Sequence, residues 1–189
     1  MKSIENKKFE KILAFHSSPA MLGIKPASLF TVADTEEAAE NIRIFNGKAS
    51  VKGLKIRELC LIKNRRLLLV YNEKALERQM SNENVLKMFS KFGYDKDLSM
   101  EQRIDILAEK IGADKVFPHE IGLFLGYPVD DIQGFIDNKG ENYLLCGYWK
   151  VYSDEERAKR IFKSYNNCRS YIINKLNSGE DIYKALRIS

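Results

Sequence analysis

Two strand-like runs joined by three residues restrict the fold of this chain more than any other feature. The stretches "LKIRELCLI" at 54–62 and "RLLLVYN" at 66–72 are rich in aliphatic and branched side chains, which strands favour. Lys63, Asn64 and Arg65 lie between them, and a connection this short joins antiparallel neighbours. The sequence therefore predicts a β-hairpin, and with it a sheet that is mainly antiparallel.

Helical patterns surround the hairpin on both sides. The first helix is expected at about 4–14, with Ile4, Phe9, Ile12 and Leu13 on the side that faces the core. A strand is expected at 27–32, and a helix at 35–45 that is capped by Asp34 or Thr35 and stopped by Asn46 and Gly47. The pattern is helical from 74 to 112, with segments 84–93 and 100–112 that end at Gly93 and Gly112, the second capped by Ser99. The remaining elements are expected at 117–128 and 129–140 (short helices), 142–152 (strand), 154–179 (long helix capped by Ser153) and 181–188.

Composition limits the class of protein. Of 189 residues, 44% are hydrophobic and 30% charged, and no run approaches the roughly 18 apolar residues of a membrane span. The N-terminus has no secretory signal, so we expect one soluble, cytoplasmic domain without a membrane partner. Cys60, Cys146 and Cys168 are odd in number and far apart, which predicts reduced, mostly buried thiols rather than a metal or disulfide site. The net charge of +5 is too dispersed to indicate a partner.

The stretch "FPHEIGLFLGYP" at 117–128 is the most informative for function. Pro118 suits a first helical position, and Tyr127 before Pro128 suits a helix end. Helical spacing predicts two faces, because side chains three or four apart share a side. The predicted core face holds Phe117, Ile121, Phe124 and Leu125, and the other face holds His119, Gly122 and Gly126. Each interior glycine costs about 1 kcal/mol relative to alanine, which favours close approach by a ligand or another backbone.

His119 and Glu120 are the candidate catalytic residues. A helix N-terminus disfavours imidazolium, so His119 is suited to act as a neutral donor, acceptor or base. The alternative is that His119 or Glu120 only caps the helix, and that Glu120 only complements the helix dipole. The zinc-protease motif HExxH is absent because position 123 is Leu, so no metal site is predicted.

Two other segments carry candidate ligand-binding residues. In "GYWKVY", strand alternation places Lys150 between Tyr148 and Tyr152, where charge and cation-π contact suit an anionic or flat ligand. Alternatively, the lysine only lies along the rings. In "HSSPAMLGIKPAS" at 16–28, Pro19, Gly23 and Pro26 predict an irregular loop, and ordinary loop polarity is the alternative to binding. Its exposed donors would be His16, Ser17, Ser18, Lys25 and Ser28.

A helix-turn-helix rhythm at 119–138 is a competing interpretation. Gly122, the turn glycine Gly126 and apolar residues at the expected packing positions fit that motif. The second helix, however, carries Asp130, Asp131 and Asp137, and acidic groups oppose the phosphate contacts that dominate DNA affinity. A nucleic-acid partner is therefore not the leading prediction.

Several segments together resemble a family of uncharacterised bacterial proteins from Firmicutes, domain of unknown function thirty-seven ninety-three. The resemblance rests on "SPAMLGIKPASLF" at 18–30, "LLLVY" at 67–71, "FPHEIGLFLGYPVDDIQGFI" at 117–136 and "GYWKVY" at 147–152. It implies a single cytoplasmic domain and no particular activity. A cysteine is common in that family just before the first proline; Ser18 stands there in this chain, which argues against thiol chemistry.

The sequence predicts a single α+β domain, with a small, mainly antiparallel sheet of three to four strands covered by several helices. The leading hypothesis is a site for a small anionic or planar ligand, where the His119 helix end meets the Lys25 loop and the Lys150 strand. The alternatives are a DNA-binding regulator and a non-catalytic interaction protein whose Gly122 and Gly126 serve packing alone. No cofactor, reaction or oligomeric state is predicted.

Overall fold

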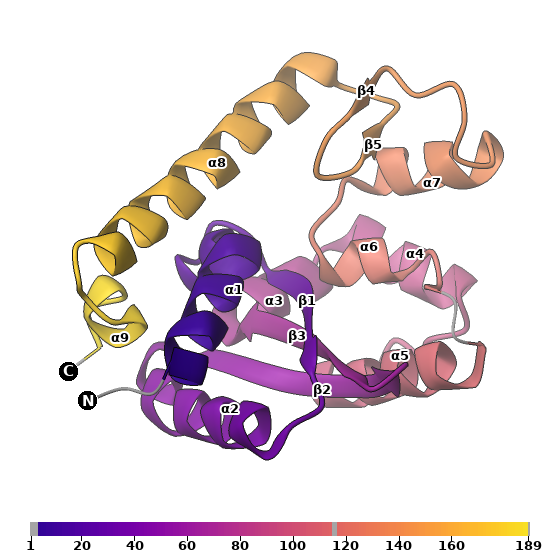
Figure 1. Ribbon diagram of the computed structural model, residues 1–189. Coiled ribbons are helices and arrows are strands. Elements are labelled where there is room, and N and C mark those ends of the chain that lie inside the picture. Colours follow the sequence, from indigo (N-terminus) through magenta and orange to yellow (C-terminus); the bar gives the residue numbers. More distant parts are fainter. Residues whose placement is uncertain (1–3, 115–116, 189) are drawn as a thin grey trace.

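The computed structural model describes residues 4–114 and 117–188 (Figure 1). Along the chain the elements are α1 (Ile4–Met21), β1 (Ala27–Ala33), α2 (Glu36–Ala49), a 3-10 turn (Ser50–Lys52), β2 (Leu54–Ile62), β3 (Arg65–Asn72), α3 (Glu73–Met80), α4 (Glu83–Lys91), α5 (Met100–Asp114), α6 (Ile121–Phe124), α7 (Val129–Asp137), β4 (Leu145–Cys146), β5 (Lys150–Val151), α8 (Glu155–Asn177) and α9 (Ile182–Ala185).

The main sheet has three antiparallel strands in the order β1-β3-β2. Every side chain of β3 from Leu67 to Tyr71 is buried, because helices cover both faces of this central strand. The turn between β2 and β3 consists of Lys63 and Asn64, with φ of 46° and 58°. Two successive residues in this region form a type I′ turn, whose twist matches that of the strands. The predicted hairpin is confirmed, although Arg65 already belongs to β3.

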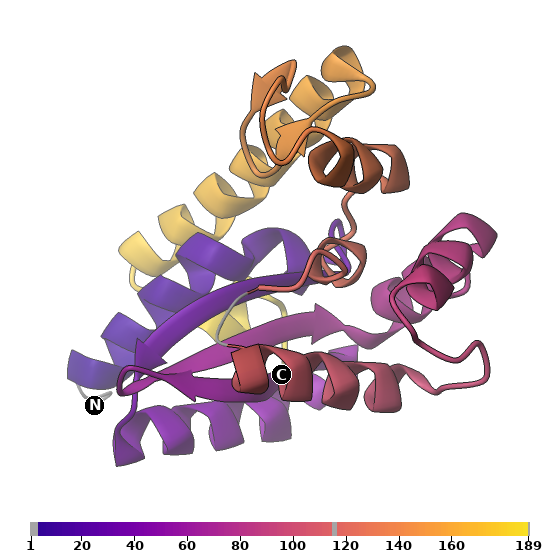
Figure 2. The ribbon, with the colours of Figure 1, turned by 90° about the vertical axis from the view of Figure 1, so that its right-hand side faces the viewer.

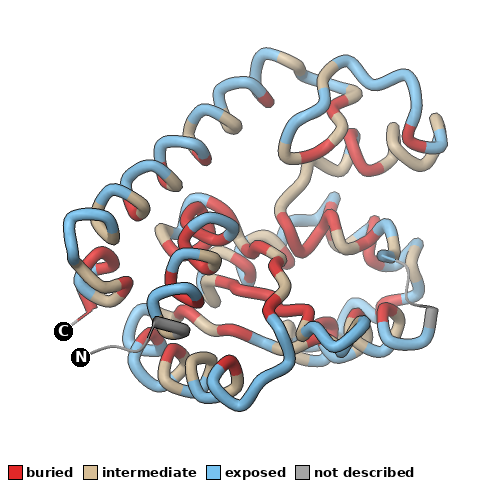
Figure 3. Tube along the Cα trace, viewed as in Figure 1, coloured by how far each residue is buried: buried red, intermediate tan, exposed pale blue. Residues whose placement is uncertain are grey.

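Alternation along the strands creates two cores, one on each face of the sheet. Figure 2 shows helices on both faces, and Figure 3 marks the buried residues along the chain. Leu68 and Val70 face the side covered by α1, α2, α9 and the C-terminal part of α8. Leu67, Leu69 and Tyr71 face the side covered by α3, α4, α5 and α6. The α+β class and the antiparallel three-stranded sheet are therefore as predicted.

A third cluster lies in the upper part of Figure 1, where α7 and the small β4-β5 hairpin meet the start of α8. Its buried members are Trp149, Val151, Ala158 and Tyr165. The other end of α8 packs on α1 through Ile172 and its neighbours. One long helix therefore connects the small hairpin to the main core.

The predicted break after the first helix is wrong. Helix α1 runs to Met21 with Pro19 inside it, so His16, Ser17 and Ser18 are helical. The burial of Ala20 and Met21 outweighs the loss of one backbone hydrogen bond at the proline. Of the residues expected to face the core, Phe9 and Leu13 are buried and Ile12 is half-buried, whereas the side chain of Ile4 lies outside the described part.

Three other predicted helix boundaries also differ. Asn46 and Gly47 do not stop α2, because the Asn46 side chain exchanges two hydrogen bonds with the backbone of Ile56, of 2.7 and 2.9 Å, and so fastens the helix to β2. Helix α5 continues past Gly112 to Asp114. The N-cap of α8 is Asp154 rather than Ser153. The predicted caps Thr35 and Ser99 are confirmed.

The stretch 142–152 is not one strand, as predicted, but the hairpin of β4 and β5. The chain reverses at Gly147, whose N–H donates to the Trp149 carbonyl at 3.1 Å. A side chain on Gly147 would overlap the Phe162 ring, so the hairpin packs directly on α8 here. The predicted alternation of Tyr148, Lys150 and Tyr152 on one strand face is therefore lost. Of the three free cysteines only Cys168 is buried, against the prediction of mostly buried thiols.

Candidate functional site

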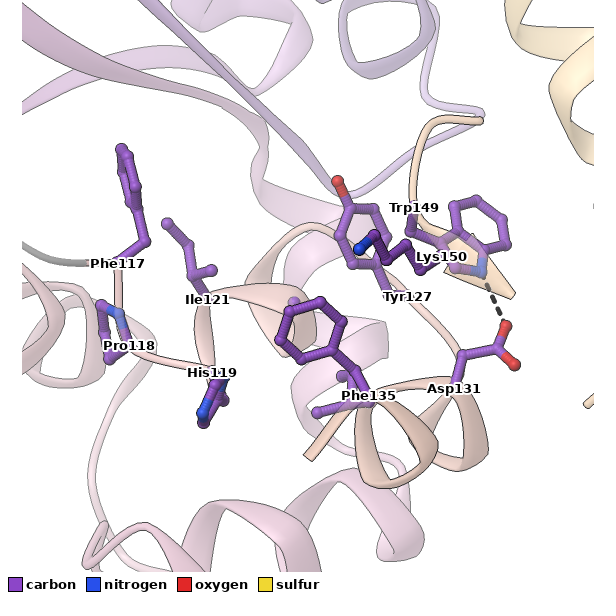
Figure 4. Close-up of a pocket in the computed structure, with 11 residues that line it drawn as sticks. Phe117, Pro118, His119, Ile121, Tyr127, Asp131, Phe135, Trp149 and Lys150 are labelled. Atoms are coloured by element: carbon purple, nitrogen blue, oxygen red, sulfur yellow. Dashed lines mark hydrogen bonds between the residues drawn. The ribbon is translucent and has the colours of Figure 1, made fainter. Parts of the chain in front are cut away.

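A pocket of about 230 Å³ lies between the segment that precedes α6, the helix α7 and the strand β5 (Figure 4). Most of its wall is apolar. The lining residues are Phe117, Pro118, His119, Ile121, Gly122, Tyr127, Asp131, Ile132, Phe135, Trp149 and Lys150. His119 and Lys150, which the sequence analysis selected from two distant segments, thus share one pocket.

The segment that begins this wall is a turn rather than a helix. The N–H groups of Ile121 and Gly122 donate to Pro118 and His119, at 3.1 and 3.2 Å, and α6 starts only at Ile121. The prediction that Pro118 is the first helical residue is therefore wrong. Phe117, expected in the core, is 51% exposed, whereas Phe124 and Leu125 are buried as predicted. His119 is exposed to solvent and lines the pocket.

Aromatic rings form two sides of the pocket. The Tyr127 and Trp149 rings lie 5.2 Å apart between centroids and 30° from parallel. On another side the His119 and Phe135 rings are 5.6 Å apart. Burial raises the pKa of Tyr127 to about 12, and its hydroxyl donates to the Tyr148 carbonyl at 3.0 Å. Tyr127 is therefore a neutral wall residue and not a proton donor to a ligand.

Lys150 supplies positive charge at the pocket. Its Nζ donates to the Gly140 carbonyl at 2.6 Å and lies 4.8 Å from the centroid of the Tyr143 ring and 5.8 Å from that of Phe135. A lysine ammonium has three N–H donors, so donors remain for a ligand. Figure 4 shows Lys150 among the residues that line the pocket.

Asp131 lines the pocket but its carboxylate is fully engaged. It accepts hydrogen bonds from Trp149 Nε1 at 2.6 Å, from the Ser153 hydroxyl at 2.8 Å, and from the backbone N–H groups of Tyr152 and Ser153 at 2.8 and 2.9 Å. These bonds fix the indole of Trp149 in the wall (Figure 4). Asp131 is thus a positioning residue, a role that its charge in the sequence does not reveal.

Glu120 lies outside the pocket lining. Its buried carboxylate accepts from Lys110 Nζ at 2.7 Å and from the Tyr94 hydroxyl at 3.5 Å, on the side that faces α5. Burial, followed by the nearby Glu120 charge, raises the pKa of Tyr94. The ion pair connects the turn before α6 to α5, and this accounts for Glu120 without a ligand.

Lys25 is separated from the pocket by the Tyr127 ring. Its Nζ lies 5.4 Å from the centroid of Tyr127 and 5.8 Å from that of Tyr165, and it donates no hydrogen bond to a described residue. Burial lowers the pKa of this amine from 10.5 to about 8. The predicted exposed loop is therefore wrong at this position, since Lys25 is only 6% exposed.

Replacing Lys25 with methionine is expected to stabilise the protein by about 3 kcal/mol near neutral pH, since one pKa unit corresponds to about 1.4 kcal/mol. The folded-state pKa of about 8 lies below the ordinary 10.5, so the unfolded chain binds more protons between these values. Wild-type stability should rise with pH across this window, and the advantage of Lys25→Met should shrink and vanish above it. Urea denaturation of both proteins across the window checks this; a difference that does not change with pH would contradict it.

The two glycines of the predicted smooth strip pack against protein. A side chain at Gly122 would meet Ile132 at 3.0 Å, and one at Gly126 would meet Pro26 at 2.5 Å. Gly126 also has a φ of +74° and follows α6 instead of lying within it. Gly122 contributes to the pocket lining and Gly126 does not.

The remaining predicted ligand-binding residues lie elsewhere. Ser28 is in β1 and buried, and its hydroxyl has no partner within the described part of the chain. The Tyr148 hydroxyl donates to Asn166 at 2.9 Å, and Tyr152 packs against Gly134. Neither tyrosine lines the pocket. Tyr127, Phe135 and Trp149 were not selected, because only the tertiary packing of α7 on the β4-β5 hairpin brings these rings together.

Residues 4–114 and 117–188 contain neither a candidate membrane span nor a candidate metal cluster. None of the helices there combines the length and apolar character that a bilayer crossing requires. Nor do these residues include a group of three or more His, Cys, Asp or Glu side chains that could hold a metal ion.

Comparison with known proteins supports the resemblance noted in the sequence. The chain matches the family described as protein of unknown function (DUF3793) over residues 13–186. No curated protein and no solved structure matches the chain significantly. Since the family match covers almost the whole sequence, the chain belongs to the DUF3793 family of proteins of unknown function.

Proposed function

We propose that this protein binds a small planar molecule with an anionic group in the pocket between His119, Trp149 and Lys150. The observation that carries the proposal is that His119 and Lys150, 31 positions apart in the sequence, line one pocket whose walls are aromatic. Apolar concave sites with a few polar groups are the usual form of small-molecule sites.

The size of the pocket limits the ligand. A cavity of about 150 Å³ holds one benzene molecule, and this pocket has about 230 Å³. One ring or two fused rings therefore fit within it. A flat ligand is favoured because the walls offer ring faces and edges, as in offset and edge-to-face aromatic packing.

The charge of the pocket indicates the polar part of the ligand. The Lys150 ammonium is the cation of the lining, and the Asp131 carboxylate is already satisfied by four donors. The His119 imidazole has no hydrogen-bond partner among the described residues, is exposed, and lies 5.6 Å from the Phe135 ring. An aromatic carboxylate would place its ring among the side walls, near His119 and Phe135, and its charge near Lys150.

A fluorescence titration tests the proposal directly. Trp149 is the only tryptophan of the chain and lines the pocket, so a bound aromatic carboxylate such as 2-naphthoate should change its emission. We expect Lys150→Met and His119→Ala each to weaken binding about tenfold, equivalent to about 1.4 kcal/mol. Lys163→Met is the matched control, since Lys163 is exposed on α8 and outside the lining.

Two outcomes would contradict this function. One is that none of a panel of one- and two-ring carboxylates changes Trp149 emission or the melting temperature. The other is that Lys150→Met and Lys163→Met lower affinity equally, which would indicate attraction by overall charge alone.

The DNA-binding alternative receives no support from the geometry. The predicted first helix is reduced to the four residues of α6. On α7, Asp130 and Asp137 are exposed, and a phosphate backbone would meet their carboxylates. Gln133, a candidate base-reading side chain, is bonded to Asp137 at 2.8 Å.

A further inference from the structure

A second and larger concavity lies on the other side of the Tyr127 segment. It has a volume of about 610 Å³ and is bounded by α4, by residues 126–133 and by the first turns of α8. Figures 1 and 2 show α4 and α7 on the same side of the molecule. Its lining residues are Gln79, Asn82, Asn84, Val85, Lys87, Met88, Lys91, Gly126, Tyr127, Pro128, Val129, Asp130, Gln133, Arg157 and Ile161. We call it the α4-α8 groove; of these residues only Tyr127 also lines the smaller pocket.

The charge of the groove is predominantly positive. Lys87, Lys91 and Arg157 contribute three cations, against the single carboxylate of Asp130. Lys87 and Lys91 are one turn apart on α4, while Arg157 approaches from α8. Among the described residues, Lys87 and Arg157 form no ion pair, and Lys91 makes only a 3.4 Å contact with the Gln133 amide. These cations are therefore available to an anion.

The groove also contains neutral hydrogen-bonding groups and an apolar surface. The amide side chains of Gln79, Asn82, Asn84 and Gln133 line it. Asn82 accepts from two backbone N–H groups of α4, Gln79 donates to the Leu123 carbonyl at 3.3 Å, and Gln133 is bonded to Asp137 and Lys91. The amide of Asn84 and the remaining donors and acceptors of the other three can recognise ring nitrogens, ring carbonyls and hydroxyls. The half-buried Tyr127, Pro128, Val129 and Ile161 add an apolar surface, whereas the lining residues Val85 and Met88 are themselves buried.

We propose that the α4-α8 groove is a second binding site, which takes a phosphorylated small molecule with a flat polar ring, such as a nucleoside phosphate. The phosphate would contact Lys87, Lys91 and Arg157, and the ring would lie on the apolar surface among the amides. Arginine and lysine are the usual phosphate partners in proteins. A volume of about 610 Å³ is sufficient for such a ligand, whereas the smaller pocket of about 230 Å³ is not.

Asp130 allows a test in which two kinds of substitution change the affinity for the ligand in opposite directions. Its exposed carboxylate lines the groove and would repel a phosphate. Removing this charge should strengthen the binding of a phosphorylated ligand, while removing the cations should weaken it. A purely structural role for these residues predicts neither change.

Calorimetric titration with ADP at low salt is the experiment. We expect the Lys87→Met, Arg157→Met double variant to bind ADP at least about tenfold more weakly, and Asp130→Asn about threefold more tightly. Lys163→Met should bind as the wild type does. Adenosine and inorganic phosphate, titrated separately, should each bind more weakly than ADP, because each occupies half of the site.

Three results would overturn this assignment. The first is that the wild type binds neither ADP nor GDP. The second is that the double variant binds ADP with the same affinity as the wild type, and the third is that Asp130→Asn binds ADP more weakly. His119→Ala should leave ADP binding unchanged, because His119 lines only the smaller pocket. A failure of the α4-α8 groove proposal can therefore be distinguished from a failure of the proposed function of the smaller pocket. If His119→Ala abolishes ADP binding instead, the nucleotide occupies the smaller pocket and the groove is not its site.

Discussion

Asp131→Ala is expected to lower the free energy of unfolding by about 5 kcal/mol, because four donors lose their common acceptor. A hydrogen bond to a charged group contributes about 1.5–3 kcal/mol, and a buried donor left without a partner adds a desolvation penalty. The free energy of unfolding of a protein is typically about 5–15 kcal/mol, so this loss would be a large part of the total stability. The side chain is 3% exposed, which leaves water little access to replace it.

Urea denaturation followed by Trp149 fluorescence measures this effect. The neighbouring Asp130→Ala is the matched control, since Asp130 is exposed, and its change should stay within about 0.5 kcal/mol. Asp131→Asn should fall between the two, because one carboxamide oxygen still accepts. If the two alanine variants lose equal stability, the Asp131 hydrogen bonds do not hold the fold in the way their geometry indicates.

The role of Asp131 also explains why the charges of α7 in the sequence were a weak guide to what its acidic side chains do. In the sequence, Asp130 and Asp131 are two equivalent acidic residues in the first turn of a helix, and both argue against DNA binding. In the structure only Asp130 is exposed, while Asp131 fastens α7 to the start of α8. Its donors lie 18 to 22 positions away, and no local pattern reveals a bond over that separation.

The β2-β3 hairpin could be predicted because its determinants are local. Two runs of strand-forming residues and a short connection suffice, and Lys63 and Asn64 take the turn conformation that this length requires. The β4-β5 segment shows the converse. "NYLLCGYWKVY" is equally rich in aromatic and branched residues, yet it folds back at Gly147 because the hairpin packs against Phe162 of α8.

For the pocket, the sequence identified single residues but not their directions. His119 and Lys150 do share a pocket. Glu120, adjacent to His119, points instead to Lys110 and Tyr94, because the residues before α6 form a turn. Lys25 has the predicted charge, but its amine lies against the Tyr127 ring and the residue does not line the pocket. The direction of a side chain in a turn depends on tertiary contacts, which the periodicity of the sequence does not show.

Gly126→Ala is expected to lower the free energy of unfolding by about 4 kcal/mol, for two separate reasons. A non-glycine residue in the left-handed region costs about 1–2 kcal/mol, and overpacking costs about 1–3 kcal/mol. The added Cβ would lie 2.5 Å from Cγ and 2.6 Å from Cδ of Pro26. The proline ring cannot rotate away, and its carbonyl is held by the Asn72 N–H at 3.0 Å. Thermal and urea unfolding of the variant measure the loss.

Gly93→Ala separates the two contributions. Gly93 has a φ of +84°, but a Cβ there would have no neighbour within 4 Å, so only the backbone term of about 1–2 kcal/mol remains. The excess loss in Gly126→Ala then measures the contact between Gly126 and Pro26. Equal losses in both variants would show that Pro26 yields and that the close packing is unimportant. Gly126 lines the α4-α8 groove. If Gly126→Ala keeps the stability of the wild type but no longer binds ADP, the glycine allows the close approach of a ligand, as the sequence predicted, and not the packing of Pro26.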